Sequence, residues 1–97
     1  MNIQAMMAQA RKLQKDIEKS TTEIENSVFT YENENILIES NGKYKITKIN
    51  IKNDTILEDK EMLEDILLVA FNDISSQISK KKEDKLGKYT AGLGGIL

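Results

Sequence analysis

The sequence LEDKEMLEDILLVAFND, residues 57–73, predicts a helix that one small domain cannot cover by itself. Asp59 is placed to cap its N-terminus, and Glu61 and Glu64 lie in the first two turns, where the helix dipole favours negative charge. Residues 66–71, ILLVAF, then form an unbroken apolar run. A helix that is apolar nearly all round must be covered on more than one side. Because the chain has only 97 residues, we expect this run to lie in a subunit interface.

The length and composition indicate one small domain without thiol or imidazole chemistry. The chain has 97 residues, 14 basic and 16 acidic, and contains no Cys, His or Pro. Without Cys no disulfide can form, and without His the commonest metal ligand is absent. No apolar run approaches the roughly 20 residues of a membrane span, and the N-terminus carries no signal-peptide pattern. We therefore expect a cytoplasmic protein with a domain at residues 1–90 and a flexible glycine-rich tail at residues 91–97.

The first predicted element is a helix over residues 3–27 with an apolar stripe and a basic face. The stripe repeats at steps of three and four, as in a heptad, and consists of Ile3, Met6, Ala10, Leu13, Ile17 and Ile24. At about 100° per residue, four basic side chains centre almost opposite this stripe, namely Arg11, Lys12, Lys15 and Lys19. The basic face should therefore point to solvent or to an anionic partner.

Three short strands are predicted after the first helix. Residues 28–31 and 36–40 are rich in branched or aromatic side chains, and residues 32–35 between them predict a turn. Asn41-Gly42 is a strong hairpin signal, because a type I′ turn needs positive φ at both central positions. Residues 44–52 form the third predicted strand.

The third strand has an interruption in its alternation. Its apolar residues change phase between Ile46 and Ile49, so they cannot all lie on one face of a regular strand. A bulge near Thr47 or Lys48 would restore the phase. The other interpretation is that both faces of the strand are partly covered.

A second long helix is predicted from Asp59 or Lys60 to about Leu86. Gly87 is a natural residue to end it, and four lysines suit the negative end of the helix dipole, namely Lys80, Lys81, Lys82 and Lys85. At 1.5 Å per residue each helix would be roughly 35–40 Å long, whereas a compact domain of this size has a radius of gyration near 13 Å. Both helices should therefore extend beyond the sheet, where a two-fold-related copy would cover their apolar stripes. The residues expected in that interface are Leu13, Ile17, Ile66, Leu67, Val69, Ala70 and Phe71.

The residue types offer little support for catalysis, so we expect no enzyme activity, no cofactor and no bound metal. A hydrolase without His or Cys would need paired carboxylates, a Ser–Lys pair or a metal ion. Residues 58–65 contain five acids and could bind a divalent cation, but helix capping and a solvated acidic face explain them more simply. The sequence contains no phosphate-binding or dinucleotide-binding loop motif.

The two basic groups each admit two interpretations. The group on the first helix is either an ordinary solvated face with ion pairs to nearby acids or a phosphate-binding surface. Residues 80–88 contain five lysines, which either complement the helix dipole or bind phosphate. In a dimer each group occurs twice, so that paired cationic surfaces can form. Arg11 is the only arginine, and direct reading of base edges is therefore less well supported than phosphate contact.

Residues 49–73 resemble the YbaB/EbfC family of bacterial nucleoid-associated proteins, in which a strand, an acidic turn and a helix of this kind recur. Weaker similarity lies at MMAQARKLQKDIEKS, residues 6–20, and at KKKEDKLGKYTAGLGG, residues 80–95. The resemblance implies an α+β fold with α-β-β-β-α order, a three-stranded antiparallel sheet and two long projecting helices, assembled as a tweezer-like homodimer. It also implies binding of double-stranded DNA in the nucleoid, with an influence on compaction and transcription.

The resemblance further implies which residues contact DNA, because contacts in the family are attributed to the projecting helices. The matching positions are Arg11, Lys12, Lys15, Lys19, Lys80, Lys81, Lys82 and Lys85. Two departures from the family pattern are evident. Residues 32–35, ENEN, replace a glycine-rich segment, and residues 53–55, NDT, replace a turn that often contains proline, where we expect a looser turn.

Our leading hypothesis is a homodimeric, non-enzymatic DNA-binding protein with weak or shape-based sequence preference. We expect no membrane partner and no small-molecule substrate. The alternative is a protein–protein adaptor that uses the apolar helix faces and the acidic patch at residues 58–65. A metal-dependent enzyme that uses the same acidic patch is a third class, which we disfavour.

Overall fold

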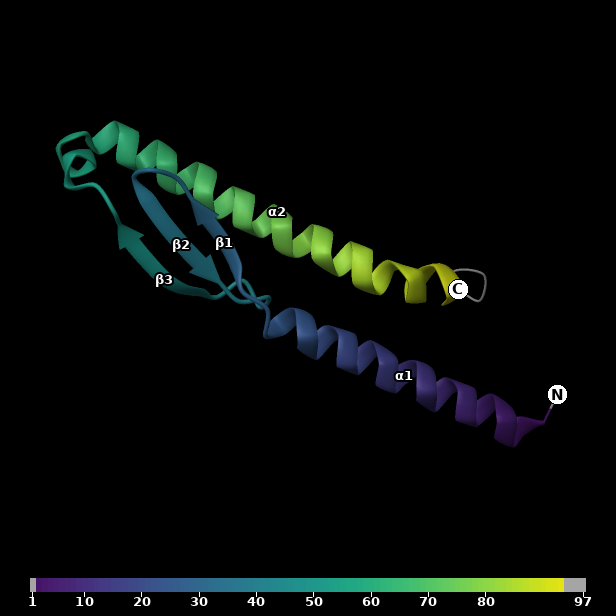
Figure 1. Cartoon of the computed structure of the whole chain (residues 1–97). Coiled ribbons are helices and arrows are strands. Elements are labelled where there is room, and N and C mark those ends of the chain that lie inside the picture. The colour runs from purple at the N-terminus through teal and green to yellow at the C-terminus, as the bar shows by residue number, and fades with distance from the viewer. Residues whose placement is uncertain (1, 94–97) are drawn as a thin grey trace.

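A computed structural model of the chain describes residues 2–93 (Figure 1). Its elements in order are α1 (Ile3–Glu25), β1 (Phe29–Glu32), β2 (Ile36–Ser40), β3 (Ile46–Ile51), the short 3₁₀-helix η1 (Asp54–Glu58) and α2 (Lys60–Leu93). The strands form one antiparallel sheet in the order β1-β2-β3. The expected α+β class and the α-β-β-β-α order are therefore confirmed.

Side-chain capping fixes both ends of α1. The Asn2 carboxamide oxygen accepts a hydrogen bond from the Gln4 amide at 2.9 Å, as an N-cap residue should. At the other end the Ser27 hydroxyl donates to the Glu23 carbonyl oxygen at 2.7 Å. The helix ends at Glu25, two residues before the predicted boundary, because this side-chain contact and the extended β1 strand replace its last turn.

The predicted β-bulge in the third strand is confirmed. Glu39 pairs with Lys48, whereas the next residue of β2, Ser40, pairs with Ile46. Thr47 is therefore the extra residue of β3. The bulge brings Ile46 and Ile49 to the same face of the sheet, the face that is turned towards α2.

The predicted type I′ turn at Asn41-Gly42 is wrong. The connection spans residues 41–45, and among the described residues the positive φ belongs to Tyr44, at 64°, and to no glycine. The Asn41 carboxamide oxygen instead closes the loop by accepting from the amides of Lys43 and Lys45, at 2.8 and 3.2 Å. The bulge shifts the pairing by one residue, which makes a two-residue turn too short.

Gly42 is required for a different reason than the one predicted. Its amide donates to the Glu25 carbonyl oxygen at 3.2 Å, so the loop passes directly against the end of α1. A Cβ at Gly42 would overlap the Ile24 carbonyl oxygen and lie 2.9 Å from the Glu25 Cα. The backbones can approach this closely only because glycine has no side chain.

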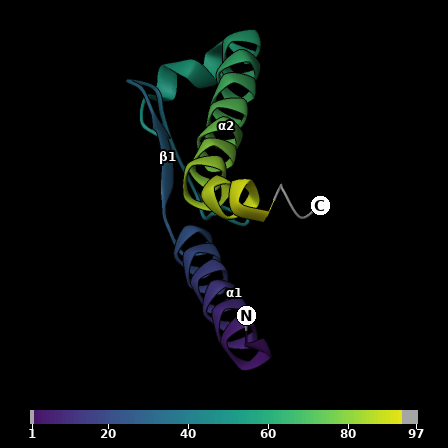
Figure 2. The ribbon, with the colours of Figure 1, turned by 90° about the vertical axis from the view of Figure 1, so that its right-hand side faces the viewer.

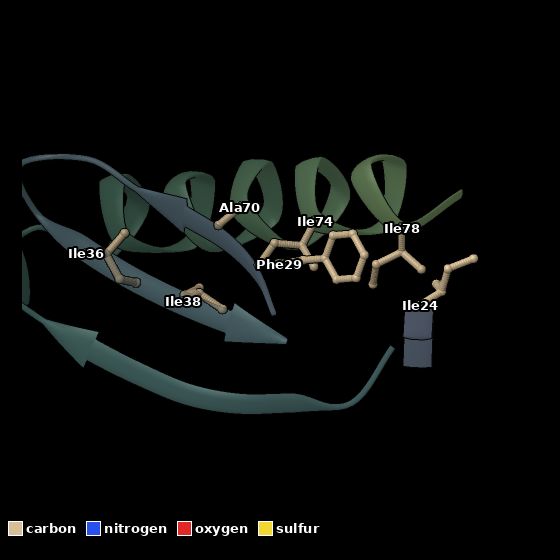
Figure 3. Packing of buried hydrophobic residues seen from close by; sticks show 7 residues of the cluster. All are labelled: Ile24, Phe29, Ile36, Ile38, Ala70, Ile74 and Ile78. Atoms are coloured by element: carbon tan, nitrogen blue, oxygen red, sulfur yellow. The ribbon is translucent and has the colours of Figure 1, made fainter. Parts of the chain in front are cut away.

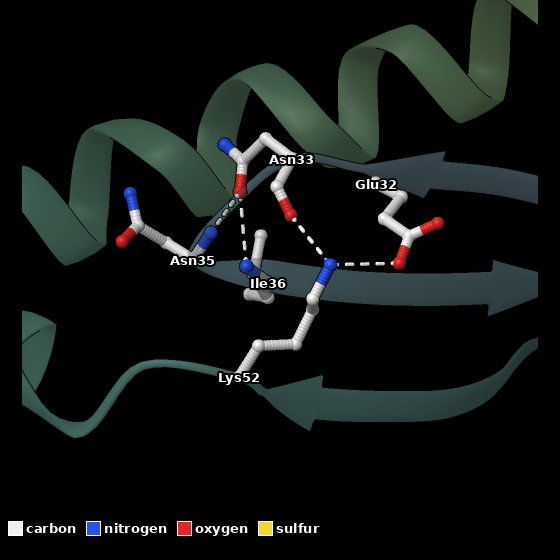
Figure 4. Close-up of polar contacts among 5 residues, drawn as sticks. All are labelled: Glu32, Asn33, Asn35, Ile36 and Lys52. Carbon is white, nitrogen blue, oxygen red and sulfur yellow. Dashed lines mark hydrogen bonds and ion pairs between the residues drawn. The ribbon is translucent and has the colours of Figure 1, made fainter.

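The β1–β2 turn is ordered without glycine (Figure 4). The Asn33 carboxamide oxygen accepts from the amides of Asn35 and Ile36 at 2.8 and 2.9 Å. From the end of β3, the Lys52 ammonium reaches Glu32 at 2.8 Å and the Asn33 carbonyl oxygen at 3.0 Å. An Asx-type turn therefore takes the place of a glycine-rich segment, and a lysine neutralises one of its two acids.

The chain between β3 and α2 is not the loose turn that we expected. Asn53 caps η1, since its carboxamide oxygen accepts from both the amide and the hydroxyl of Thr55, at 3.1 and 2.8 Å. Ile56 is buried and anchors this short helix to the protein. The Asp59 carboxylate then accepts from the Met62 amide at 3.0 Å, so the predicted N-cap of the second helix is confirmed.

The core lies between α2 and the face formed by β1 and β2 (Figure 3). Its buried members are Ile24, Phe29, Ile36, Ile38, Ala70, Ile74 and Ile78. The Gln77 carboxamide also donates to the Thr30 carbonyl oxygen at 3.0 Å, which binds α2 to the outer edge of β1. α2 does not cover β3, and the side chain of Ile49 remains 53% exposed.

The predicted end of the second helix at Leu86 is wrong. α2 continues through Gly87 to Leu93, and a Cβ at Gly87 would meet no atom within 4 Å. A glycine inside a helix costs about 1 kcal/mol, which a continued run of backbone hydrogen bonds offsets. Residues 91–93 of the expected tail are thus helical, and residues 94–97 lie outside the described residues.

The described chain is strongly elongated, at 69 × 22 × 15 Å with a radius of gyration of 19.4 Å. A compact domain of this length would have a radius of gyration of about 13 Å. Both helices extend beyond the sheet, and α1 projects away from it (Figures 1 and 2). The expected overhang is therefore confirmed.

Gly42 and Gly87 predict opposite effects of the same substitution. Gly42→Ala should lower the free energy of unfolding by about 2 kcal/mol, because the new methyl group overlaps backbone atoms of α1. Gly87→Ala should raise it by about 1 kcal/mol, because the site is open and helical. Urea unfolding at one fixed protein concentration measures both. Equal effects of the two substitutions would contradict this packing.

Candidate nucleic-acid interface

The basic face of α1 is exposed, as its sequence predicts. The side chains of Arg11, Lys12, Lys15 and Lys19 are all exposed. On the opposite side of the helix the apolar stripe becomes progressively more covered, from an exposed Ile3 through a half-buried Leu13 and Ile17 to a buried Ile24. α1 therefore packs against the rest of the protein only at its C-terminal half. Arg11, Lys12 and Lys15 lie on its free side, whereas Lys19 borders the side that faces α2.

Three lysines of α2 lie near Lys19 of α1. Lys85 lines two adjoining hollows between the helices, one of about 190 Å³ with Lys81 and one of about 310 Å³ with Lys88. α1 contributes Lys19 to the larger hollow and Ser20 to both. We call the two hollows together the inter-helix groove. Residues separated by more than sixty positions in the chain thus form one cationic surface.

The other two predicted lysines of α2 lie elsewhere. Lys80 is exposed but lies on the outer side of α2, because its side chain is turned by about 100° around the helix from that of Lys81, which lines the groove. Lys82 is half-buried, and its Nζ lies 4.4 Å above the centre of the Tyr44 ring. Lys88 was not among the predicted contacts, although it belongs to the same basic segment, and it lines the groove.

Within residues 2–93 the groove lysines form no ion pair with a carboxylate. Ion pairs within residues 2–93 join Lys43 to Glu25 at 3.3 Å, Lys52 to Glu32 at 2.8 Å and Lys60 to Glu64 at 3.9 Å. Asp16 and Glu23 line the groove without forming such a pair in the described part of the chain. A cation that no carboxylate neutralises is available to a phosphate.

Opposite charges occupy opposite ends of the molecule. The acidic residues 58–65 lie where η1 meets α2, at the end of the sheet that is remote from the N-terminus of α1 (Figure 1). The acidic residues do not form a metal site, because within residues 2–93 no three acids come close enough together to hold a metal ion. Neither of the two described long helices is apolar enough over sufficient length to cross a bilayer.

An apolar surface lies between β3 and α2. Phe71 is 38% exposed and, with Ile46 and Tyr44, lines a hollow of about 280 Å³ over the part of the sheet that α2 leaves open. Leu68 and Val69 of α2 are also exposed, at 63% and 55%.

The expected interface residues differ in how far their own protomer buries them. Ala70 is buried in the core, whereas Ile66 and Leu67 are half-buried and pack against it. Leu13 and Ile17 on α1 are also half-buried. Val69 and Phe71 are the exposed members of the set.

Comparison with known proteins places this architecture in a family. The sequence profile of the YbaB/EbfC DNA-binding family matches residues 1–93. A nucleoid-associated protein of Lactococcus lactis subsp. cremoris (strain MG1363) is 44% identical, over 96% of this chain and 97% of the relative. A nucleoid-associated protein of Ligilactobacillus salivarius (strain UCC118) is 36% identical over 99% and 95%. One from Hahella chejuensis (strain KCTC 2396) is 36% identical over 96% and 88%. This chain, with its α-β-β-β-α fold, therefore belongs to the YbaB/EbfC DNA-binding family, which is not a known enzyme family.

Proposed function

We propose that this protein binds double-stranded DNA in the bacterial nucleoid as a homodimer and has no enzymatic activity. The observation that carries the proposal is the inter-helix groove, where Lys19 of α1 meets Lys81, Lys85 and Lys88 of α2. Phosphate contact requires clustered cations at suitable spacing, which lysine side chains supply. Arg11, Lys12 and Lys15 extend the same charge along the free side of α1.

The apolar surface beside β3 supports the dimer. Phe71 and Ile46 are exposed apolar side chains that line one hollow, and Ile49 is exposed on the same face of the sheet as Ile46. Exposed apolar surface of this kind marks association sites, and a two-fold axis lets one patch cover its own copy. In such a dimer the basic grooves occur in pairs, so one duplex can contact both.

The same residues suggest weak or shape-based sequence preference. Lysines on phosphates position DNA without reading its bases, and Arg11 is the chain's only arginine. Binding at many sites in the cytoplasm would influence nucleoid organisation and transcription through coverage and spacing of the duplex. The curated relatives are named nucleoid-associated proteins, which supports this setting.

The groove predicts how DNA affinity responds to salt. Replacing Lys81, Lys85 and Lys88 with Gln should flatten the slope of log K against log salt by up to about 2.7 per subunit, at 0.9 per phosphate released. Fluorescence anisotropy of a labelled random duplex at several KCl concentrations measures the slope. The matched control replaces Lys43, Lys52 and Lys60 with Gln. These substitutions remove the same total charge, but from lysines that already pair with carboxylates. Equal flattening in both triple variants would show that net charge, not the groove, determines binding.

The apolar surface predicts how association can be broken. Phe71→Glu combined with Ile49→Glu should convert a dimer to a monomer at micromolar concentration, because two carboxylates would be buried against apolar groups. Sedimentation velocity measures the mass. Ser76→Glu adds a carboxylate at another exposed position of α2 and should leave the dimer intact. A wild-type monomer at these concentrations would refute the proposed dimer.

A further inference from the structure

Tyr44 adopts a backbone conformation that is unusual for its side chain. Its φ of 64° lies in the left-handed region, which glycine and asparagine tolerate far better than a bulky aromatic residue. Such a conformation persists only where surrounding contacts hold it. The contacts of the Tyr44 side chain should therefore stabilise the fold around it.

The Tyr44 side chain makes two contacts with one turn of α2. Its hydroxyl lies 3.1 Å from the Ser79 hydroxyl, within hydrogen-bonding distance. The Lys82 ammonium lies 4.4 Å above the centre of its ring, a cation–π geometry. Because Ser79 and Lys82 are three residues apart, both lie on the same side of the helix. One aromatic residue thus engages the turn that carries the lysine-rich segment.

The loop around Tyr44 is also attached to α1. The Gly42 amide donates to the Glu25 carbonyl oxygen at 3.2 Å, and the Lys43 ammonium pairs with the Glu25 carboxylate at 3.3 Å. A cavity of about 260 Å³ at this junction is lined by residues of all three segments, among them Ile24, Tyr44 and Lys82. The loop therefore joins the C-terminal end of α1 to the middle of α2.

We propose that Tyr44 is a positioning residue for DNA binding and that Lys82 is its anchor rather than a phosphate contact. Tyr44 holds Lys82 at the loop, which fixes the rotation and position of the turn that presents Lys81 to the inter-helix groove. Two consecutive lysines then have different tasks, since Lys81 lines the inter-helix groove and Lys82 lies over the Tyr44 ring. This assignment depends on the proposed DNA binding and gives Lys82 a different role from the one expected from sequence.

The neighbouring lysines provide a matched pair of substitutions. Lys81→Gln should flatten the salt slope of DNA binding by up to about 0.9 per subunit, because one phosphate contact is lost. Lys82→Gln removes the same charge one residue away and should lower both the affinity and the melting temperature while leaving the salt slope unchanged. Lys82→Arg should restore both quantities, because arginine retains the cation over the ring. A salt slope that Lys82→Gln flattens as much as Lys81→Gln does would overturn the assignment.

Substitution of Tyr44 tests the contact from its other side. Tyr44→Leu should lower the affinity and the melting temperature at least as much as Lys82→Gln, because it removes the hydrogen bond to Ser79 as well as the ring under Lys82. The double variant should melt no lower than Tyr44→Leu alone, because that substitution already removes the interaction with Lys82. Tyr44→Phe keeps the ring under Lys82 and should therefore lower the affinity and the melting temperature less than Tyr44→Leu does. If the decreases in melting temperature of the two single variants add up in the double variant, the coupling between Tyr44 and Lys82 is refuted.

The melting experiments need no DNA, which separates the two proposals. If the wild-type protein binds no duplex, the DNA-binding function fails and the positioning role fails with it, while the melting data still decide whether Tyr44 anchors Lys82. If DNA binds and Tyr44→Leu changes neither affinity nor melting temperature, the positioning role alone is refuted.

Discussion

Ile74 and Ile78 of α2 share one buried cluster with side chains of β1 and β2, and this helix–sheet packing determines where everything else lies. It places the helix over β1 and β2 and leaves the adjoining face of β3 uncovered. Because α2 has 34 residues and the strands have four to six, the helix must continue past the sheet. Its lysine-rich part then lies beside α1. One helix–sheet contact thus generates both an apolar surface and a basic one.

These two surfaces are separate, so the proposed self-association and the proposed DNA binding would use different residues. The open apolar surface lies over β3, whereas the inter-helix groove lies between α1 and α2. The acidic residues 58–65 are remote from the N-terminal part of α1. In the proposed complex, a duplex would be attracted to the cationic side chains of α1 and repelled by the acidic residues at the opposite end.

Sequence predicted those features that depend on local chemistry. The β2 strand, the Asp59 cap and the bulge at Thr47 follow from side-chain type and alternation, and all three are confirmed. The family and the order of the elements were also recognisable from a motif of 25 residues. Both basic groups could be identified as groups. Which lysines of each group line the inter-helix groove could be learned only from how α2 packs against α1 and the sheet.

The wrong predictions share a cause: at these positions tertiary contacts outweigh the local conformational preferences of the residues. Gly87 ends many helices but here lies within one, and Asn41-Gly42 favours a tight turn that the bulge forbids. The sequence gives no sign that Tyr44 adopts positive φ or that its ring lies beneath Lys82, since those facts depend on residues 35 and 38 positions away. The different surroundings of Lys81 and Lys82 were invisible for the same reason.

The hydrogen bond from Gln77 to the Thr30 carbonyl oxygen also affects whether another chain can add a strand to the edge of the sheet. An open strand edge invites another chain to extend the sheet. β1 is only four residues long, and α2 occupies one of its outward carbonyl groups. On the opposite border the bulge and Lys48 interrupt β3. Both borders of the sheet are thus poor templates for strand addition, so they do not favour fibril formation between copies of the chain.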